Sequence, residues 1–588
     1  MNIRVLVSLP ALVLTLAAGL PAALVMGWII SGEPGVLKLA ASRVERFLAF
    51  FLMCAAIFAY FLGKRDRKFS PVFLTKPARA EFPLLALPLF PLGAYAFLTF
   101  FQAREALYLP DLDYTGMSSA LNETARGFGL LITPYFHTGS SGSYLGHHFS
   151  PALLLLVPFY RATGLGGEWL SHFAAGDFRP DHGLYGILLG LFLAWGLYLW
   201  GRLAFQELNS RLLLLGALAG FALSYPLWRL VLSFHFEVLV LPFSALTFLG
   251  WKRRRAWLFW VGLFLWIMVK EDTAVYAAFF LLPGLLDRER RNLAVLGLVV
   301  CVAYFLMSNL FLRHFFAGDA APEWNYWKGA SLSNFRFRSL ADLLLACGLL
   351  PLLRPAFFFG AILPLLILQS LSGHAWHASF YGHYSYTVLP LLLYGTLEGW
   401  KRLRGARAIP LTLLVLGLIA YSAAGDRETP LPFPGDSRYG RVRELARAVP
   451  PGACVRVQTT FSALIPLDAR VLPLKGFANN PFPDGFGPFP AKSREGGGAR
   501  ERIADQLRSC RGVYLLLDTV DYAPYHAKKD MDVLLQEAKR SGKVAAQSGS
   551  LRLYRFSGAR SGRDGKSDGK SDVRSDGRSD GRSGKKRL

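Results

Sequence analysis

The sequence is poor in charged residues, and it lacks the short motifs of soluble nucleotide-dependent enzymes. Only 18% of its 588 residues are charged, whereas 53% are hydrophobic. Soluble globular proteins carry about 25% charged residues, so this balance favours a chain whose solvent is largely lipid. The sequence has no Walker loop, dinucleotide fingerprint, nucleophile elbow or zinc motif in a convincing context. Chemistry driven by nucleotide hydrolysis is therefore not expected.

The five cysteines are too scattered to suggest a metal site. Cys54, Cys301 and Cys347 lie in apolar segments, whereas Cys454 and Cys510 lie in the more polar C-terminal part. Two interpretations of this second pair remain open. They form a disulfide if that part is extracytoplasmic, or they are two separate thiols.

Long apolar runs recur along the first 424 residues. A helix needs about 20 residues to cross about 30 Å of hydrocarbon, and several runs approach or reach this length. They are 5–30, 46–63, 82–101, 183–201, 211–230, 293–313 and 408–424. The first run is longer than the core of a signal peptide, so we expect a retained span rather than a cleaved signal.

Basic clusters between the apolar runs account for much of the net charge of +25. Cytoplasmic loops are enriched in Lys and Arg, so these clusters predict topology rather than nucleic-acid binding. They lie at 64–68, 252–255, 287–291 and 401–404. Placing all of them in the cytoplasm gives about 13 crossings, with the loop 102–150 and everything after residue 424 outside.

The additional crossings are shorter than the apolar runs above. They are predicted at 236–251, 340–353, 356–371 and 386–400, with a hairpin of two short helices at 256–286. Residues 151–163 are apolar but too short to cross, and we expect them to be re-entrant.

The chain therefore divides into an N-terminal two-span extension (1–75), a polytopic membrane core (76–424), an extracytoplasmic α/β domain (425–558) and a tail (559–588). The α/β domain is predicted from a helix at 441–448, strands at 454–457, 469–474 and 513–518, and a hairpin at 543–556. The tail repeats Ser, Asp, Gly and basic residues, which predicts disorder. It is either an electrostatic tether or a solvated tail without a role.

Two carboxylates, Asp111 and Asp113, open the first large loop just beyond a predicted span. A carboxylate at this position could act as a general base or bind a divalent cation. It could equally cap the helix expected at 115–125.

Ionisable groups at membrane depth are costly unless they pair or bind a ligand. Lys270-Glu271-Asp272 interrupts the predicted apolar hairpin, and His235 and Glu237 lie at the outer mouth of a predicted span. A buried Glu237 requires a cationic or protonic partner, which Lys270 could supply. A purely structural ion-pair network would have the same pattern.

Histidines and tyrosines occur in two predicted outer loops. Adjacent His147 and His148 point in different directions, so we expect one functional histidine rather than a joint metal site. His383 and Tyr384 follow in a later loop. Residues of an interfacial belt would give the same pattern.

Taken in this order, these residues resemble the membrane family known as domain of unknown function 2079, found in bacteria and archaea. The resemblance covers about residues 100–530. It implies a multi-pass protein of the inner (cytoplasmic) membrane. The chain departs from the family's pattern at His147, where Asp commonly stands, and at Phe236, where Pro is usual. The resemblance rests on Asp113, His148-Phe149-Ser150-Pro151, His235-Phe236-Glu237, Lys270-Glu271-Asp272, His383-Tyr384 and Tyr514 to Asp518.

This family in turn looks like the GT-C glycosyltransferases, an analogy of fold and loop position. It implies an α-helical polytopic protein that uses a polyprenyl-phosphate-linked sugar to modify a cell-envelope acceptor. Asp113 would be the catalytic base or would bind a divalent metal ion, with Asp111 as its substitute. Lys270, with His148 or His383, would stabilise the charge on the donor phosphate. The other expected substrate-binding residues are His235, Glu237, Glu271, Asp272 and Tyr384.

Two other functions remain open. A transporter or flippase for a lipid-linked or anionic solute would use Glu237 and Lys270-Glu271-Asp272 to carry protons or bind a headgroup. A non-catalytic envelope scaffold is the third. Membrane lipid is an expected partner in every case, and nucleic acid is not.

Overall fold

The computed structural model describes residues 114–133, 142–165, 181–317, 330–380, 382–403, 408–425, 436–472, 512–520 and 542–556, and parts of 76–107 and 532–540. Several predictions fall outside these residues. They are the spans at 5–30 and 46–63, the basic cluster at 64–68, Asp111, Asp113 and the tail at 559–588.

The described chain is mostly helical, and two of its helices are long and apolar enough to cross a membrane. They are α9 (Gly183–Glu207) and the continuous helix Arg291–Ala317, which comprises α15 (Arg291–Met307), a short wider turn and α16 (Arg313–Ala317). A third candidate forms if α10 (Arg211–Leu223) and α11 (Tyr225–Leu232) count as one span bent by 45°. Pro226 in the first turn of α11 lacks the amide hydrogen needed to continue α10, which explains this break.

Shorter helices fill the rest of the helical body. The predicted spans at 236–251, 386–400 and 408–424 correspond to α12 (Val240–Arg253), α21 (Leu389–Trp400) and α22 (Ala408–Gly425). The predicted span at 340–353 contains α17 (Phe337–Ala346), and that at 356–371 contains α18 (Pro355–Phe357) and α19 (Leu363–Ser370). Before α9, the chain forms α5 (Gly116–Ala125), α6 (Tyr144–His147) and α7 (Val157–Leu165).

The predicted hairpin of two short helices is confirmed. It consists of α13 (Ala256–Ile267) and α14 (Thr273–Leu281). Glycines let α13 lie directly against α12, since a Cβ on Gly262 would come within 2.4 Å of the Thr247 amide nitrogen. At 1.5 Å per residue, α13 is about 18 Å long and α9 is about 37 Å long.

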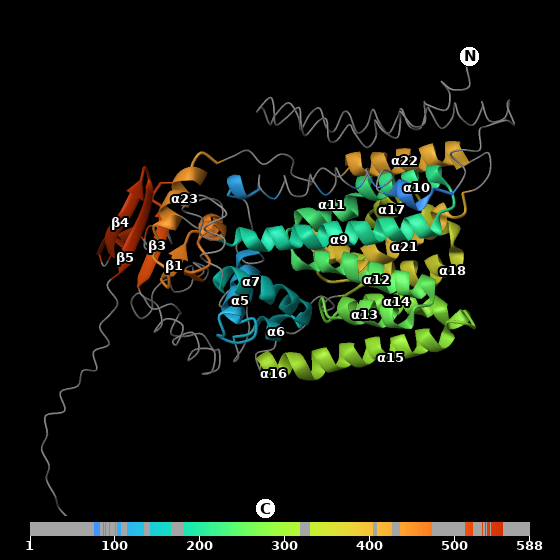
Figure 1. Cartoon of the computed structure of the whole chain (residues 1–588), viewed down its shortest axis with the longest axis horizontal. Helices are drawn as coiled ribbons and strands as arrows, with labels where there is room; N and C mark the ends of the chain where they lie inside the picture. Colours follow the sequence, from blue (N-terminus) through green and yellow to red (C-terminus); the bar gives the residue numbers. More distant parts are fainter. Residues whose placement is uncertain are drawn as a thin grey trace, which may run out of the picture.

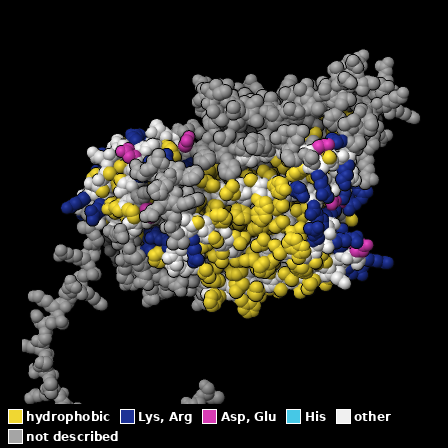
Figure 2. Space-filling view, viewed as in Figure 1, with side chains coloured by type: hydrophobic (Ala, Val, Ile, Leu, Met, Phe, Trp, Pro, Cys, Tyr) yellow, Lys and Arg dark blue, Asp and Glu magenta, His cyan; other side chains and the backbone are white. Residues whose placement is uncertain are grey.

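Basic residues gather at one end of the helical body. Figure 2 shows a broad hydrophobic band bordered at one end by Lys and Arg side chains. Lys252 Nζ lies 2.5 Å from Glu398 Oε1, and Lys401 Nζ lies 2.6 Å from Glu207 Oε2 at the end of α9. Arg254 also pairs with Glu289, which lies in another of the basic clusters. Three predicted cytoplasmic clusters thus contribute to one charged end.

The α/β domain lies at the opposite end (Figure 1). Its five strands are arranged in the order β2-β1-β3-β5-β4, with β1, β2 and β3 parallel and β5 antiparallel to its two neighbours. The predicted helix and strands are confirmed as α23 (Tyr439–Arg447), β1 (Cys454–Val457), β2 (Arg470–Leu472), β3 (Val513–Asp518), β4 (Gly542–Ser548) and β5 (Leu551–Phe556). Cys454 is disulfide-bonded, whereas Cys301 and Cys347 are free thiols.

The α/β domain is fixed to the helical body through α5. The Thr115 and Ser462 hydroxyl oxygens lie 2.8 Å apart, and Asn122 Nδ2 donates to the Leu467 carbonyl oxygen at 2.7 Å. Arg470 lies 3.6 Å from Glu123 across the same contact. Burial raises the pKa of Glu123, although Arg470 opposes this effect. The two parts therefore meet through buried polar contacts.

Candidate functional site

The candidate site is built around the tip of the α13–α14 hairpin. The hairpin starts beside the basic end, and α13 is only about half as long as α9, so its tip lies well inside the helical body. The Thr273 hydroxyl stabilises the tip, lying within 3.0 Å of the carbonyl oxygens of Trp266, Ile267 and Lys270. The Ala152 amide donates to the Met268 carbonyl at 3.0 Å, which brings the segment after α6 onto the tip.

The predicted partnership between Lys270 and Glu237 is confirmed. Lys270 Nζ donates to Glu237 Oε1 at 3.2 Å, and the two residues are 1% and 0% exposed. The ammonium group also lies 5.3 Å from the centre of the Tyr386 ring, at a distance suited to a cation–π interaction. Lys270 is therefore a buried cation held by a carboxylate on one side and an aromatic ring on another.

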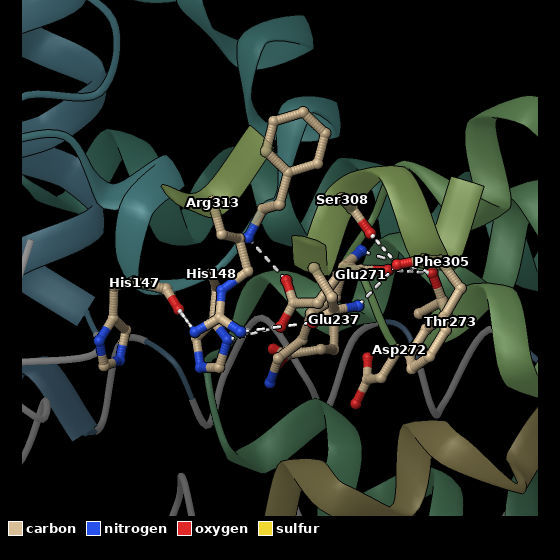
Figure 3. A network of polar contacts seen from close by, with 12 residues as sticks. His147, His148, Glu237, Glu271, Asp272, Thr273, Phe305, Ser308 and Arg313 are labelled. Carbon is tan, nitrogen blue, oxygen red and sulfur yellow. Dashed lines mark hydrogen bonds and ion pairs between the residues drawn. The ribbon is translucent and has the colours of Figure 1, made fainter. Parts of the chain in front are cut away.

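Glu271 forms a second buried pair, with His148. Glu271 Oε1 lies 2.8 Å from His148 Nδ1, and Glu271 Oε2 accepts a hydrogen bond from the Phe149 amide at 2.6 Å. Figure 3 shows Glu271 next to His148, with Glu237 in the same network. Arg313 donates to the carbonyl oxygen of His147 at 3.2 Å. Glu271 and His148 were each predicted as candidate site residues, but the sequence did not predict that they pair.

Asp272 points away from this pair and is held by two tyrosines. Its Oδ2 accepts hydrogen bonds from the hydroxyls of Tyr276, at 3.0 Å, and Tyr386. Asp272 Oδ1 is buried and has no hydrogen-bond partner in the described part of the chain. Tyr276 follows Asp272 by four residues, so helical spacing could have identified this contact.

The predicted histidine-rich loops also converge here. The His235 and His383 rings stack, with centroids 4.4 Å apart and planes 14° apart. His235 Nδ1 faces Glu237 Oε2 in a close polar contact. Tyr384 is buried, with its ring centroid 4.2 Å from that of His383 and 5.5 Å from those of His374 and His377. Eight predicted residues from four separated segments thus form one cluster.

A cavity of about 390 Å³ adjoins the hairpin tip. Glu271, Asp272, Asn309, Gln369 and His377 contribute polar groups to its lining. Gln369 Oε1 is buried without a hydrogen-bond partner among the described residues. Sequence reasoning missed Gln369, although an amide near the end of the apolar helix α19 is a signal that could have found it. The apolar lining residues are Val275, Tyr276, Phe305, Leu365 and Leu368.

The two expected catalytic carboxylates, Asp111 and Asp113, lie outside the described residues. Tyr114, the next residue, is fully buried and anchored to the start of α9. Its hydroxyl donates to the His182 carbonyl oxygen and accepts from the Gly186 amide, each at 2.9 Å. The roles predicted for Asp111 and Asp113 stay predictions.

The apolar helical body, its candidate spans and its recessed polar cluster are those of an integral membrane protein. The chain belongs to the family described as predicted membrane protein (DUF2079), whose sequence profile matches residues 104–475. This match contains the whole polar cluster and ends after β2, short of the predicted end near residue 530. No curated protein matches the chain.

Proposed function

We propose that the protein is a membrane-embedded glycosyltransferase of the GT-C type, which transfers sugar from a polyprenyl-phosphate donor to a cell-envelope acceptor. The cavity beside the hairpin tip carries this proposal. Its volume of about 390 Å³ and its apolar wall suit part of a lipid chain. Asp272 Oδ1 and Gln369 Oε1 are acceptors without partners among the described residues, so they suit a hydroxyl-rich sugar.

The proposed reaction uses a base for the acceptor and a cationic group for the leaving phosphate. Asp113 removes the proton from an acceptor hydroxyl, whose oxygen forms a bond to the anomeric carbon. The bond from this carbon to the phosphate oxygen breaks, and polyprenyl phosphate leaves with the bonding electrons. Lys270, oriented by Glu237 at 3.2 Å, stabilises the negative charge on the leaving group together with His148 or His383.

The proposed topology has about 13 crossings, with the α/β domain outside the cytoplasm, where it holds the acceptor. Two observations support this orientation. The basic clusters meet at the end of the helical body that is remote from the α/β domain (Figures 1 and 2). Cys454 in that domain is disulfide-bonded, as is typical of proteins in oxidising compartments.

Turnover of a radiolabelled donor tests the proposal. Full-length protein in lipid nanodiscs is supplied with polyprenyl-phosphate sugars and an envelope extract as acceptor. We expect transfer by the wild type, and a loss of at least about a hundredfold in Asp113→Asn. Asp342→Asn, in an exposed i,i+4 pair with Arg338, is the control and should keep full activity. Unchanged transfer in both Asp113→Asn and Asp111→Asn would contradict the proposal.

A proton-coupled transporter or flippase is the second candidate, and the two recessed pairs of ionisable groups favour it. Lys270 with Glu237 and Glu271 with His148 place ionisable groups deep in an apolar body, as proton relays do. In this case Glu237→Gln abolishes proton-coupled flux of the lipid-linked solute in proteoliposomes. Donor turnover is then absent in the wild type as well.

A further inference from the structure

We propose that His235, Glu237 and His383 bind a divalent metal ion of the zinc class. Each residue offers one ligand atom, and these atoms all lie within 4.8 Å of one another. His235 and Glu237 are buried, and His383 is half-buried. The residues come from two distant segments, before α12 and before α21, which the fold brings together.

The three residues lie close enough together to share a single ion after small side-chain rotations. Ligand atoms lie about 2.0–2.2 Å from zinc, so two ligands of one ion are at most about 4 Å apart. The three ligand atoms lie within 4.8 Å of one another, and His235 Nδ1 is in close contact with Glu237 Oε2, so rotation of these side chains is needed to surround one ion. The stacked rings of His235 and His383 show that the two imidazoles are direct neighbours.

The donor set selects the kind of ion. Two imidazoles and one carboxylate are typical ligands of zinc and of neighbouring transition metals, whereas Mg²⁺ and Ca²⁺ prefer oxygen ligands alone. Glu237 can serve two partners because its Oε1 accepts from Lys270 at 3.2 Å, while its Oε2 faces His235. Lys270 thereby orients the Glu237 carboxylate, as groups that hydrogen-bond to a metal ligand commonly do.

The charged groups around the three ligands include one more carboxylate than cations. The carboxylates are Glu237, Glu271 and Asp272, against the ammonium group of Lys270 and the guanidinium group of Arg313, which donates to the His147 carbonyl oxygen. The surroundings therefore do not repel a bound cation.

The backbone is strained shortly before each of the two histidine ligands. Phe234, directly before His235, has φ 51°, and Phe380, three residues before His383, has φ 55°. A bulky residue in this left-handed region costs about 1–2 kcal/mol, so such residues persist where the surrounding structure enforces them.

This inference does not depend on the proposed glycosyl transfer, because a bound ion would serve a transferase or a transporter. It also differs from the metal role considered for Asp113, since it uses other residues. Metal binding and donor turnover therefore succeed or fail separately.

Cobalt binding provides the test. Full-length protein carrying no polyhistidine tag is stripped with a chelator in detergent and titrated with Co²⁺ and then Zn²⁺. We expect one ion per chain, a visible absorption band from bound cobalt and its displacement by zinc. Glu237→Gln and His383→Gln should each weaken binding at least about tenfold. His314→Gln, at an exposed histidine on α16, is the matched control and should bind as the wild type does.

A variant that replaces one metal ligand by another distinguishes loss of the metal site from misfolding. His383→Cys keeps a metal ligand, so it should still bind cobalt and add a thiolate-to-cobalt charge-transfer band in the near ultraviolet. The proposal is overturned if the wild type binds no stoichiometric ion, if Glu237→Gln and His383→Gln bind as tightly as the control, or if His383→Cys shows no thiolate band.

Discussion

Removing the positive charge of Lys270 should destabilise the protein far more than its few contacts suggest. Lys270→Met retains most of the apolar side chain but leaves Glu237, which is 0% exposed, without its cation. Breaking a buried ion pair by removing one partner costs about 3–5 kcal/mol, chiefly because the remaining charge stays desolvated. We expect a loss of this size in the single variant.

A double variant tests whether the unpaired charge of Glu237 causes this loss of stability. Glu237→Gln combined with Lys270→Met removes both charges, so it should recover at least about 2 kcal/mol relative to the sum of the two single variants. The exposed pair Arg254–Glu289, with side chains 66% and 63% exposed, is the control and should show a coupling below about 1 kcal/mol.

Unfolding of the purified, metal-stripped full-length chain in mixed detergent micelles, followed by tryptophan fluorescence, gives the four free energies of this cycle. A coupling at Lys270 and Glu237 as small as that of the exposed pair would refute the reasoning. It would mean that water reaches the hairpin tip freely.

Three further predictions follow from other parts of the fold. Gly262→Ala should lower the thermal unfolding temperature, with a cost of about 1–3 kcal/mol, because its Cβ would lie 2.4 Å from the Thr247 nitrogen; Gly440→Ala, with open space around it, should not. Burial raises the pKa of Asp436, but hydrogen bonds from Arg438 outweigh burial, so the pKa of Asp436 is lowered. The stability that the Asp436 carboxylate contributes is therefore present above about pH 4 and is lost as the pH falls through the lowered pKa. Asp436→Asn should therefore weaken hydrogen-exchange protection of β3 by about 1 kcal/mol at pH 7 and converge with the wild type in acid; equal loss at both pH values would contradict this sign. In the denatured protein, Cys454 should react with maleimide only after reduction, and Cys454→Ser should destabilise the α/β domain by about 2–4 kcal/mol; labelling of the denatured protein without reductant would contradict the disulfide.

Much of the helical body could be predicted because apolar length and basic clusters act locally along the chain. The hairpin at 256–286 is an example, since charged clusters at both of its ends leave room for two short helices only. The strands of the α/β domain were predictable for a similar reason, as short β-rich runs bounded by turn residues.

Part of the site was predictable from the cost of burying charge. A carboxylate at 237 and an amine at 270, both in apolar surroundings, require a partner, and they are each other's partner. The contact between Glu271 and His148 could not be predicted, because it depends on the segment after α6 reaching the hairpin tip through the Ala152 amide. The same applies to the stacking of His235 on His383, which joins segments far apart in the sequence.

Mass spectrometry of lipids that co-purify with the protein tests the central proposal most directly. We predict a polyprenyl-phosphate-linked sugar bound to the wild type and to the exposed-site variant Asp342→Ala. Asp272→Ala and Gln369→Leu should lose it, because each removes a cavity acceptor that has no hydrogen-bond partner among the described residues. Absence of any such lipid from the wild type, or its equal retention in all variants, would contradict the proposal that this cavity holds a sugar-bearing lipid donor.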